Sequence, residues 1–282
     1  MKTRVFTVCA FIFLFCGTVN AGINDGLVAY YPFNGNANDE SGNGNNGVVH
    51  GATLTSDRFG NANNAYSFNG IDHYVVTNQI RSSFSDESLT ISVWFKVDIS
   101  GIIVTETENA TGCYGAWCSD IIRVLDSGMV TIHVEPLQHV NIGVVTFGVW
   151  HNVVIRYNGN TAKLDGFIDG MLSTNDAIGN RNSPVALGRD LYYLFGDLNS
   201  GWGYGHFGGS IDDIRIYNRA LSASEVQQIY QGSTCSIGVV RFTAGTPAKA
   251  ADVNANFDAL NCQIQALKAI VCKNEPTASV CQ

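Results

Sequence analysis

Two acidic segments flank a long stretch of β-like sequence. Asp39 lies in the loop sequence NDESGNGNNG, whose glycines expose carbonyl groups and whose asparagines add amide oxygens, and Asp212 precedes Asp213 in GGSIDDIRIY. Carboxylate and neutral oxygens are the ligands that Ca²⁺ takes in proteins. If the first and last strands of one domain lie side by side, the two segments meet. The sequence therefore predicts a calcium site that includes Asp39 and Asp212.

Two further loops hold aromatic side chains between small residues. One is NATGCYGAWCSD, residues 109–120, and the other is DLNSGWGYGHF, residues 197–207. Sugar-binding sites combine aromatic rings that stack on the ligand with polar groups, and such sites stand mostly on loops. The candidate ligand-binding residues are Tyr114, Trp117, Trp202, Tyr204 and His206. An alternative stays open, in which these rings fold down as lids over the core.

The sequence shows no catalytic pattern. A retaining glycosidase needs two carboxyl groups about 5 Å apart, and no E-x-D-x-E run occurs. Glu106 and Glu108 are interpreted as solvated charges at a strand end, and neither a G-x-S-x-G elbow nor a P-loop is present. Four histidines without metal-site spacing are predicted to be ordinary strand residues: His73, His133, His139 and His151. We therefore expect a protein that is not an enzyme.

The first 21 residues have the pattern of a secretory signal peptide. Lys2 and Arg4 precede an apolar run, and small residues follow up to Ala21, which predicts export to the extracellular space or the cell surface. Nothing later approaches the ~20 apolar residues of a membrane-spanning helix. The formal net charge of −8 would repel phosphate backbones, so we expect no nucleic-acid partner.

Six cysteines lie beyond the predicted signal peptide. In an oxidising compartment an even number can pair completely. A bond between Cys113 and Cys118 would staple one of the aromatic loops. The other four allow three pairings, all of which stay open: Cys235, Cys262, Cys272 and Cys281. Zinc binding by cysteines is disfavoured because no C-x-x-C pair occurs.

Alternation of polar and apolar residues predicts β-strands between the two acidic segments. In LTISVWFKV, residues 89–97, one face is apolar and the other is mostly polar, which indicates a protein of two layers. Trp94 and Trp150 lie inside strand patterns and are predicted to be structural. Further strands are predicted at 65–68, 73–77, 101–105, 121–125, 130–134, 150–157, 162–168 and 211–217. Asn158-Gly159 and Asp169-Gly170 should close tight hairpins.

Helix is predicted in two places. Ser222 and Glu225 form a capping box ahead of a short helix that closes the domain. Beyond residue 232 the pattern changes, and from Thr246-Pro247 onward apolar residues recur at spacings of four and three, from Val253 to Val271. This spacing is typical of a coiled-coil seam. Two interpretations stay open, namely self-association through residues 246–273, as in a trimer, and docking of one amphipathic helix on its own domain.

Five segments in order resemble the laminin-G-like, concanavalin A-like jelly-roll domains of secreted bacterial proteins. They are GLVAYYPFNGNANDESGNGNNG, AYSFNGIDHYVV, SLTISVWFK, WHNVVIRYNGNTAKLDGFIDG and GGSIDDIRIYNRALSASEVQQIY. The resemblance covers residues 22–232 and implies an all-β sandwich of two antiparallel sheets, followed by a helical, disulfide-bearing tail at 233–282. In similar domains a structural Ca²⁺ is common. Carried over, its ligands are Asp39 and Asp212, with Asn45 and the carbonyls of Gly47 or His50.

From these features we expect a secreted, calcium-stabilised, non-catalytic module that binds a glycan or a cell-surface polysaccharide. The first alternative is a structural or adhesive surface subunit, similar to a fibre protein, that oligomerises through its tail and binds a protein partner. The second is a glycoside hydrolase or polysaccharide lyase with an unrecognised site. Because one fold serves all three, function must be argued from the site.

Overall fold

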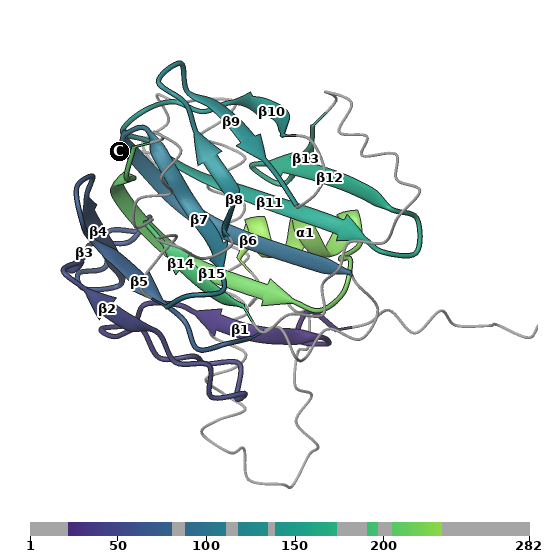
Figure 1. The fold of residues 1–282 in the computed structure, drawn as a ribbon, viewed down its shortest axis with the longest axis horizontal. Coiled ribbons are helices and arrows are strands. Elements are labelled where there is room, and N and C mark those ends of the chain that lie inside the picture. Colours follow the sequence, from purple (N-terminus) through teal and green to yellow (C-terminus); the bar gives the residue numbers. More distant parts are fainter. Residues whose placement is uncertain are drawn as a thin grey trace, which may run out of the picture.

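The protein is an antiparallel two-sheet sandwich with one short helix (Figure 1). The structure is a computed structural model that describes residues 22–80, 88–110, 118–134, 139–173, 191–196 and 205–232. The predicted signal peptide and the tail at 233–282, with its four cysteines, lie outside the described residues. Among the described residues, no helix combines the length and the apolar character needed to span a membrane.

The first sheet, sheet 1, contains eight strands in the order β13-β12-β11-β6-β15-β4-β3, with β1 paired to β15. Their bounds are β1 Leu27–Tyr31, β3 Thr53–Thr55, β4 Ala65–Asn69, β6 Leu89–Ile99, β11 Trp150–Asn158, β12 Lys163–Ile168, β13 Met171–Leu172 and β15 Gly208–Tyr217. The register of β1 on β15 places Tyr30 opposite Arg215 and Tyr31 opposite Ile214. The expectation that the first and last strands lie side by side is thus confirmed.

The second sheet, sheet 2, contains seven strands in the order β10-β9-β8-β7-β14-β5-β2. Their bounds are β2 Val48–His50, β5 Tyr74–Val76, β7 Gly101–Thr107, β8 Cys118–Val124, β9 Met129–Ile132, β10 Val140–Val144 and β14 Tyr192–Phe195. The pairing of β7 with β8 is interrupted by register shifts around Val104, where Val104 pairs with Ile122 and Thr105 pairs with Asp120. Such a bulge changes which side chains of a strand share a face.

The core lies between the two sheets. Val93 and Phe95 of β6 and Ile214 of β15 meet Val130 and Phe195 of sheet 2 in one cluster, and all five are inaccessible to solvent. These are the apolar positions of the alternating pattern, so the sequence periodicity explains both layers. Truncating a ring such as Phe95 to alanine would cost about 3–5 kcal/mol of unfolding free energy.

Of the two tight turns predicted from the sequence, one has the expected form and the other is longer. Between β12 and β13, Asp169 and Gly170 both have positive φ, at 51° and 74°, which is the two-residue turn expected from an Asp-Gly pair. The turn after β11 is longer than predicted. It runs past Gly159 to Ala162, which has a φ of 50°, and the Asn158 side chain accepts a hydrogen bond from the Thr161 amide.

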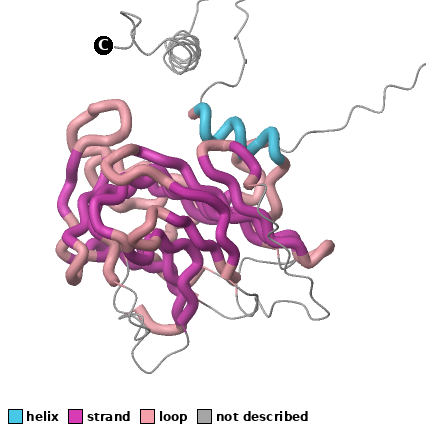
Figure 2. The backbone as a smooth tube through the Cα atoms, turned by 90° about the horizontal axis from the view of Figure 1, so that it is seen from above, coloured by secondary structure: helices cyan, strands magenta, loops and turns pink. Residues whose placement is uncertain are grey.

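Helix α1, Ala223–Gln231, covers the face of sheet 1 that points away from the core. Figure 2 shows it outside the strands rather than between them. Val226 and Ile229 pack on Phe167 and Tyr217 of the sheet. The ring of Tyr230 stacks on Trp94 with centroids 5.5 Å apart, so Trp94 is structural as predicted. The predicted capping box of Ser222 and Glu225 is present.

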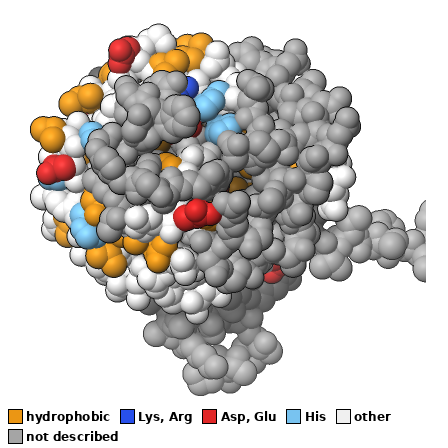
Figure 3. Space-filling model, in the orientation of Figure 1, with side chains coloured by type: hydrophobic (Ala, Val, Ile, Leu, Met, Phe, Trp, Pro, Cys, Tyr) orange, Lys and Arg blue, Asp and Glu red, His pale blue; other side chains and the backbone are white. Residues whose placement is uncertain are grey.

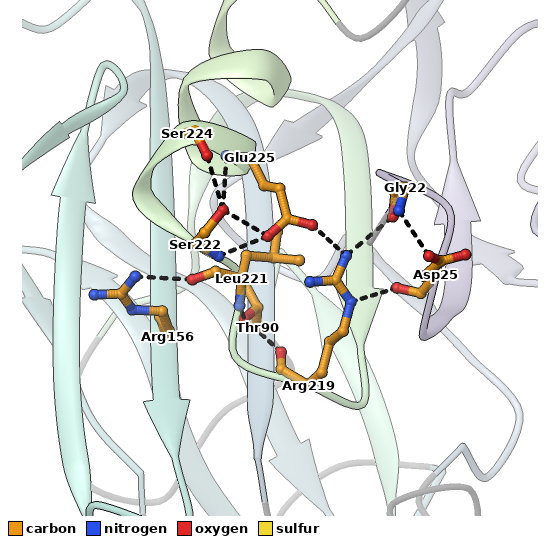
Figure 4. A network of polar contacts seen from close by, with 9 residues as sticks. All are labelled: Gly22, Asp25, Thr90, Arg156, Arg219, Leu221, Ser222, Ser224 and Glu225. Carbon is orange, nitrogen blue, oxygen red and sulfur yellow. Dashed lines mark hydrogen bonds and ion pairs between the residues drawn. The ribbon is translucent and has the colours of Figure 1, made fainter. Parts of the chain in front are cut away.

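A network of polar contacts ties this helix to the start of the domain (Figure 4). Arg219 donates to the carbonyls of Asp25 and Gly22, at 2.6 and 3.1 Å, and pairs with Glu225 at 2.5 Å. The carboxylate of Glu225 also accepts the Ser222 amide. One guanidinium therefore joins the segment before β1 to the helix N-terminus.

Candidate functional site

The loop between β1 and β2 is organised around the Asp39 carboxylate. Its Oδ1 atom accepts the amides of Tyr30 and Ser41, at 2.9 and 2.8 Å, and its Oδ2 atom accepts the amide of Asn45 at 2.9 Å. The carbonyl of Asn45 in turn accepts the Tyr31 hydroxyl. The side chain that was predicted to bind Ca²⁺ thus already anchors its own loop to β1.

The acidic pair of β15 has a different partner. Arg58, from the loop between β3 and β4, donates to Asp212 at 2.8 Å and to Asp213 at 2.9 Å. Arg215 pairs with Asp213 at 3.1 Å. The Arg58 guanidinium also lies over the rings of Phe59 and Trp94, at 4.4 and 4.5 Å from their centroids. The positive charge next to Asp212 is therefore that of the Arg58 guanidinium.

These contacts bear on the predicted calcium site. The two segments approach each other through Tyr30, whose amide binds Asp39 and whose ring packs under the Arg215 guanidinium at 4.4 Å. Asp39 and Asp212 nevertheless have separate partners. Arg58 contacts Oδ2 of Asp212, and Asp39 accepts three amides, so each carboxylate retains a lone pair for a cation. Calcium binding by Asp39 and Asp212 stays a prediction.

The weaker calcium candidates are placed as follows. Gly47 donates its amide to the Ala37 carbonyl at 2.8 Å. His50, in β2, stacks on Tyr74 of β5 with ring centroids 4.3 Å apart. The predicted ligand atoms are the backbone carbonyls of Gly47 and His50, which these contacts do not involve, so both stay predictions.

Burial perturbs the titration of the acidic pair. Desolvation is the largest cause and raises the pKa of Asp212 to about 7, and the neighbouring Asp213 adds to the increase, while Arg58 opposes it. Burial likewise raises the pKa of the Tyr30 hydroxyl to about 12. A carboxyl group that titrates near neutral pH couples the stability of this region to pH.

The candidate sugar-binding loops start from opposite ends of β7. Tyr114, Trp117, Trp202 and Tyr204 lie outside the described residues, but the strands that hold their loops are described. At one end of β7, Thr107 pairs with Cys118, where the loop of residues 109–120 returns. At the other end, His206 bridges to Ile102 after the second loop. Because β7 has seven residues, about 20 Å separates the two ends.

Cys118 stands at the start of β8 and is disulfide-bonded. Its partner lies outside the described residues, so the pairing with Cys113 stays a prediction. A disulfide at this position would restrict the conformations of the loop that carries Tyr114 and Trp117.

The outer face of sheet 2 carries a group of polar side chains. On β8 and β9, Ile122, Val124, Val130 and Ile132 belong to the core between the sheets. The residues that alternate with them must face outward. They include Arg123, Thr131 and His133. Asp120 also faces outward, because it alternates with the core residue Ile121 beside the bulge at Val104, and Thr105 of β7 lies opposite it. Figure 3 shows histidine side chains gathered beside a cationic side chain on the face seen in Figure 1.

Asp120 brings two histidines together on this face. Its Oδ1 atom lies 2.9 Å from Nε2 of His139 and 3.9 Å from Nδ1 of His133, while its Oδ2 atom accepts from Arg123 at 2.9 Å. The two imidazoles stack with centroids 4.3 Å apart. His133 and His139 were predicted to be ordinary strand residues. Their spacing in the sequence does not indicate this cluster, because the cluster depends on the pairing of β9 with β10.

Two other predictions about ionisable residues have different outcomes. His151 has a structural role, because Nδ1 lies 2.9 Å from Asp169 and Nε2 accepts the Thr146 amide. The interpretation of Glu106 as a solvated charge is wrong. Glu106 is 1% exposed, and its carboxylate accepts the hydroxyl of Tyr193, a core residue, at 3.1 Å. Strand β7 continues past the predicted end, so Glu106 lies inside the sheet.

Two antiparallel sheets with a helix on one outer face form a jelly-roll sandwich. Residues 68–227 match the model of the concanavalin A-like lectin/glucanases superfamily, and the chain belongs to that superfamily. The resemblance noted in the sequence is thereby confirmed. No curated protein matches the chain.

Solved structures with the same fold include three of different origin. Domain 4 of AbnA, a GH43 extracellular arabinanase from Geobacillus stearothermophilus in complex with arabinotriose, is 19% identical, with a TM-score of 0.54, and the match covers 72% of this chain and 98% of that domain. The binding domain of Paraclostridial Mosquitocidal Protein 1 is 19% identical, with a TM-score of 0.56 and coverage of 80% and 56%. Trypanosoma rangeli sialidase is 14% identical, with a TM-score of 0.54 and coverage of 73% and 33%. At these identities the similarity establishes the fold.

Proposed function

We propose that this protein is a secreted, non-catalytic glycan-binding module. The observation that carries the proposal is the membership of the chain in the lectin/glucanases superfamily together with two loops rich in aromatic residues that are anchored at opposite ends of β7. On the outer face of sheet 2 between these anchors, Arg123 and His133 are buried, at 7% and 6% exposed, and the side chain of His139 is 39% exposed. The aromatic side chains of the two loops are therefore the proposed sugar contacts. A domain of the same fold, from an arabinanase, is known in complex with arabinotriose, which supports an oligosaccharide as the class of ligand.

The arrangement favours an extended ligand. The two candidate loops are anchored at opposite ends of β7, about 20 Å apart. An oligosaccharide lying along the strand would contact both loops, whereas a single sugar would contact one. We therefore propose that Trp117 and Trp202 each stack on a different sugar unit of one chain.

A glycan array tests this function directly. We expect the mature, untagged chain to bind oligosaccharides. We expect Trp117→Ala and Trp202→Ala each to weaken binding at least tenfold, because truncating a tryptophan that anchors a ligand costs about 2 kcal/mol or more, and tenfold corresponds to about 1.4 kcal/mol. Phe59→Ala is the matched control, since Phe59 is an exposed aromatic, 64% accessible, outside the proposed site. An array that stays blank for the correctly folded wild-type chain, with and without calcium, would refute glycan binding.

The enzyme alternative makes a different prediction. Glu106 is buried against Tyr193, which places it away from any ligand on the outer face of sheet 2. We therefore propose binding without hydrolysis. Hydrolytic activity on an array-positive glycan that disappears in Glu106→Gln would overturn the proposal.

The adhesive alternative depends on the tail at 233–282. Trimer formation through residues 246–273 stays a prediction, and light scattering on the mature chain measures it. A monomer in solution would remove this alternative, while a trimer would add avidity to each glycan-binding domain without changing the site.

A further inference from the structure

We propose that Asp120, His133 and His139 form a binding site for a divalent transition-metal ion of the zinc type. The site lies on the outer face of sheet 2 and is separate from the predicted calcium loop at Asp39. It also does not depend on glycan binding, because its evidence is the mutual position of three side chains.

Three parts of the chain contribute one ligand atom each. Asp120 comes from β8, His133 follows the end of β9, and His139 precedes β10. The Asp120 carboxylate and the ring nitrogens of the two histidines all lie within 4.8 Å of one another. The three side chains converge here because β10 pairs with β9, which in turn pairs with β8.

The donor set selects the class of metal. Two imidazoles and one carboxylate are ligands typical of zinc and related ions, whereas Ca²⁺ prefers six to eight oxygens. With bonds of about 2.0–2.1 Å, a tetrahedral ion needs ligand atoms about 3.3 Å apart. The observed separations from Asp120 Oδ1 are 2.9 Å to His139 and 3.9 Å to His133. Movements below 1 Å would therefore reach the required spacing for these two pairs.

The imidazoles must also change their orientation. They are nearly parallel, at 15°, so their lone pairs do not yet converge on one point. His133 is 6% exposed, and the Ser119 hydroxyl lies 3.0 Å from its Nδ1 atom. For Nδ1 to bind the ion, this hydroxyl must rotate away and the ring proton must reside on Nε2. The side chain of His139 is 39% exposed and has room to turn. We infer that His139 closes the site around the ion while Asp120 and His133 stay in place.

Arg123 orients the carboxylate ligand. Its guanidinium binds Asp120 Oδ2 at 2.9 Å, which leaves Oδ1 directed at the histidines. Outer contacts of this kind fix ligand geometry in metal sites. The positive charge of Arg123 also lowers the affinity for a cation, so we expect moderate binding. Three protein ligands leave a fourth position for a water molecule or a ligand oxygen.

Metal titration of the untagged mature chain tests the site, after a thiol assay has shown that no free cysteine remains. Isothermal titration with Zn²⁺ should give one site on the wild-type chain, and Co²⁺ should give the visible absorption of a site with nitrogen and oxygen ligands. His139→Ala should weaken Zn²⁺ binding at least tenfold and abolish the Co²⁺ spectrum. Because His139 is half-exposed, this variant should fold.

The control is His50→Ala, which removes an exposed histidine from β2 of the same sheet and should leave Zn²⁺ binding unchanged. Absence of Zn²⁺ binding by the wild-type chain would refute the proposal. So would Zn²⁺ binding of equal strength in His139→Ala, since the ion would then occupy another place. In either case the role of the cluster would be structural, through the hydrogen bonds of Arg123 and His139 to Asp120.

Discussion

At the scale of single residues, Arg58 supplies positive charge to the acidic pair of β15. Its guanidinium bridges Asp212 and Asp213 and lies between the rings of Phe59 and Trp94. Breaking a buried ion pair by removing one partner costs about 3–5 kcal/mol, because the other charge is left uncompensated. Asp212 and Asp213 therefore stabilise the fold through Arg58, in addition to being candidate ligands.

Asp212 should make stability depend on pH. Its pKa is raised to about 7 in the folded protein and is about 3.9 in an unfolded chain, so between these values the folded state holds a proton that the unfolded state has lost. Its contribution to stability is complete below about pH 4 and is lost as the pH rises through 7. We expect the unfolding free energy of the wild type to fall by about 1–4 kcal/mol over that interval, relative to Asp212→Asn.

Urea denaturation of both chains at pH 4.5 and pH 7.5 measures this difference. The comparison cancels the other groups that titrate in the same range, provided that the variant keeps its contact with Arg58. An equal change in stability for both proteins would show that Asp212 ionises normally in the fold.

At the scale of elements, the loop between β1 and β2 depends on one carboxylate. Asp39 accepts three backbone amides, and each such bond to a charged group contributes about 1.5–3 kcal/mol. Asp39→Ala should therefore lower the melting temperature even in the presence of a chelator. If Ca²⁺ also binds this loop, it raises the melting temperature of the wild type and has no effect on the variant.

Differential scanning calorimetry with calcium and with chelator separates these two effects. Asn38→Ala is a suitable control, because it alters the neighbouring side chain and keeps the carboxylate. Identical melting temperatures of the wild type in both solutions would show that Ca²⁺ does not stabilise the domain. The role of Asp39 as the anchor of its loop would be unaffected.

The sequence predicted those strands, turns and helix ends whose formation depends on residues close together in the chain. The alternation in β6, the Asp169-Gly170 turn and the capping box at Ser222 depend on neighbouring residues, and each has its expected form. Glu106 was misplaced because β7 extends two residues beyond its apolar pattern. The cluster at Asp120 depends on a bulge near Val104 and on a hairpin, and neither has a signal in the sequence that fixes its register.

At the scale of the whole molecule, the two faces of the sandwich have different roles. Helix α1 covers the outer face of sheet 1 with Val226 and Ile229, and the Arg219 network fastens it to the start of the domain. The outer face of sheet 2 carries Asp120 and the histidines instead. The pairing of β1 with β15 could be predicted from the two ends of the sequence, but the partners of Asp212 could not, since Arg58 is 154 residues away.

The most direct test of the central claim is hydrogen–deuterium exchange on the mature chain with and without an oligosaccharide that the array identifies. Binding along the outer face of sheet 2 predicts slower exchange in β7, in β8 and in the peptides that contain Trp117 and Trp202, with no change in β11 and β12 of sheet 1. Protection confined to sheet 1 or to helix α1 would contradict the account, and would place the ligand on the opposite side of the sandwich.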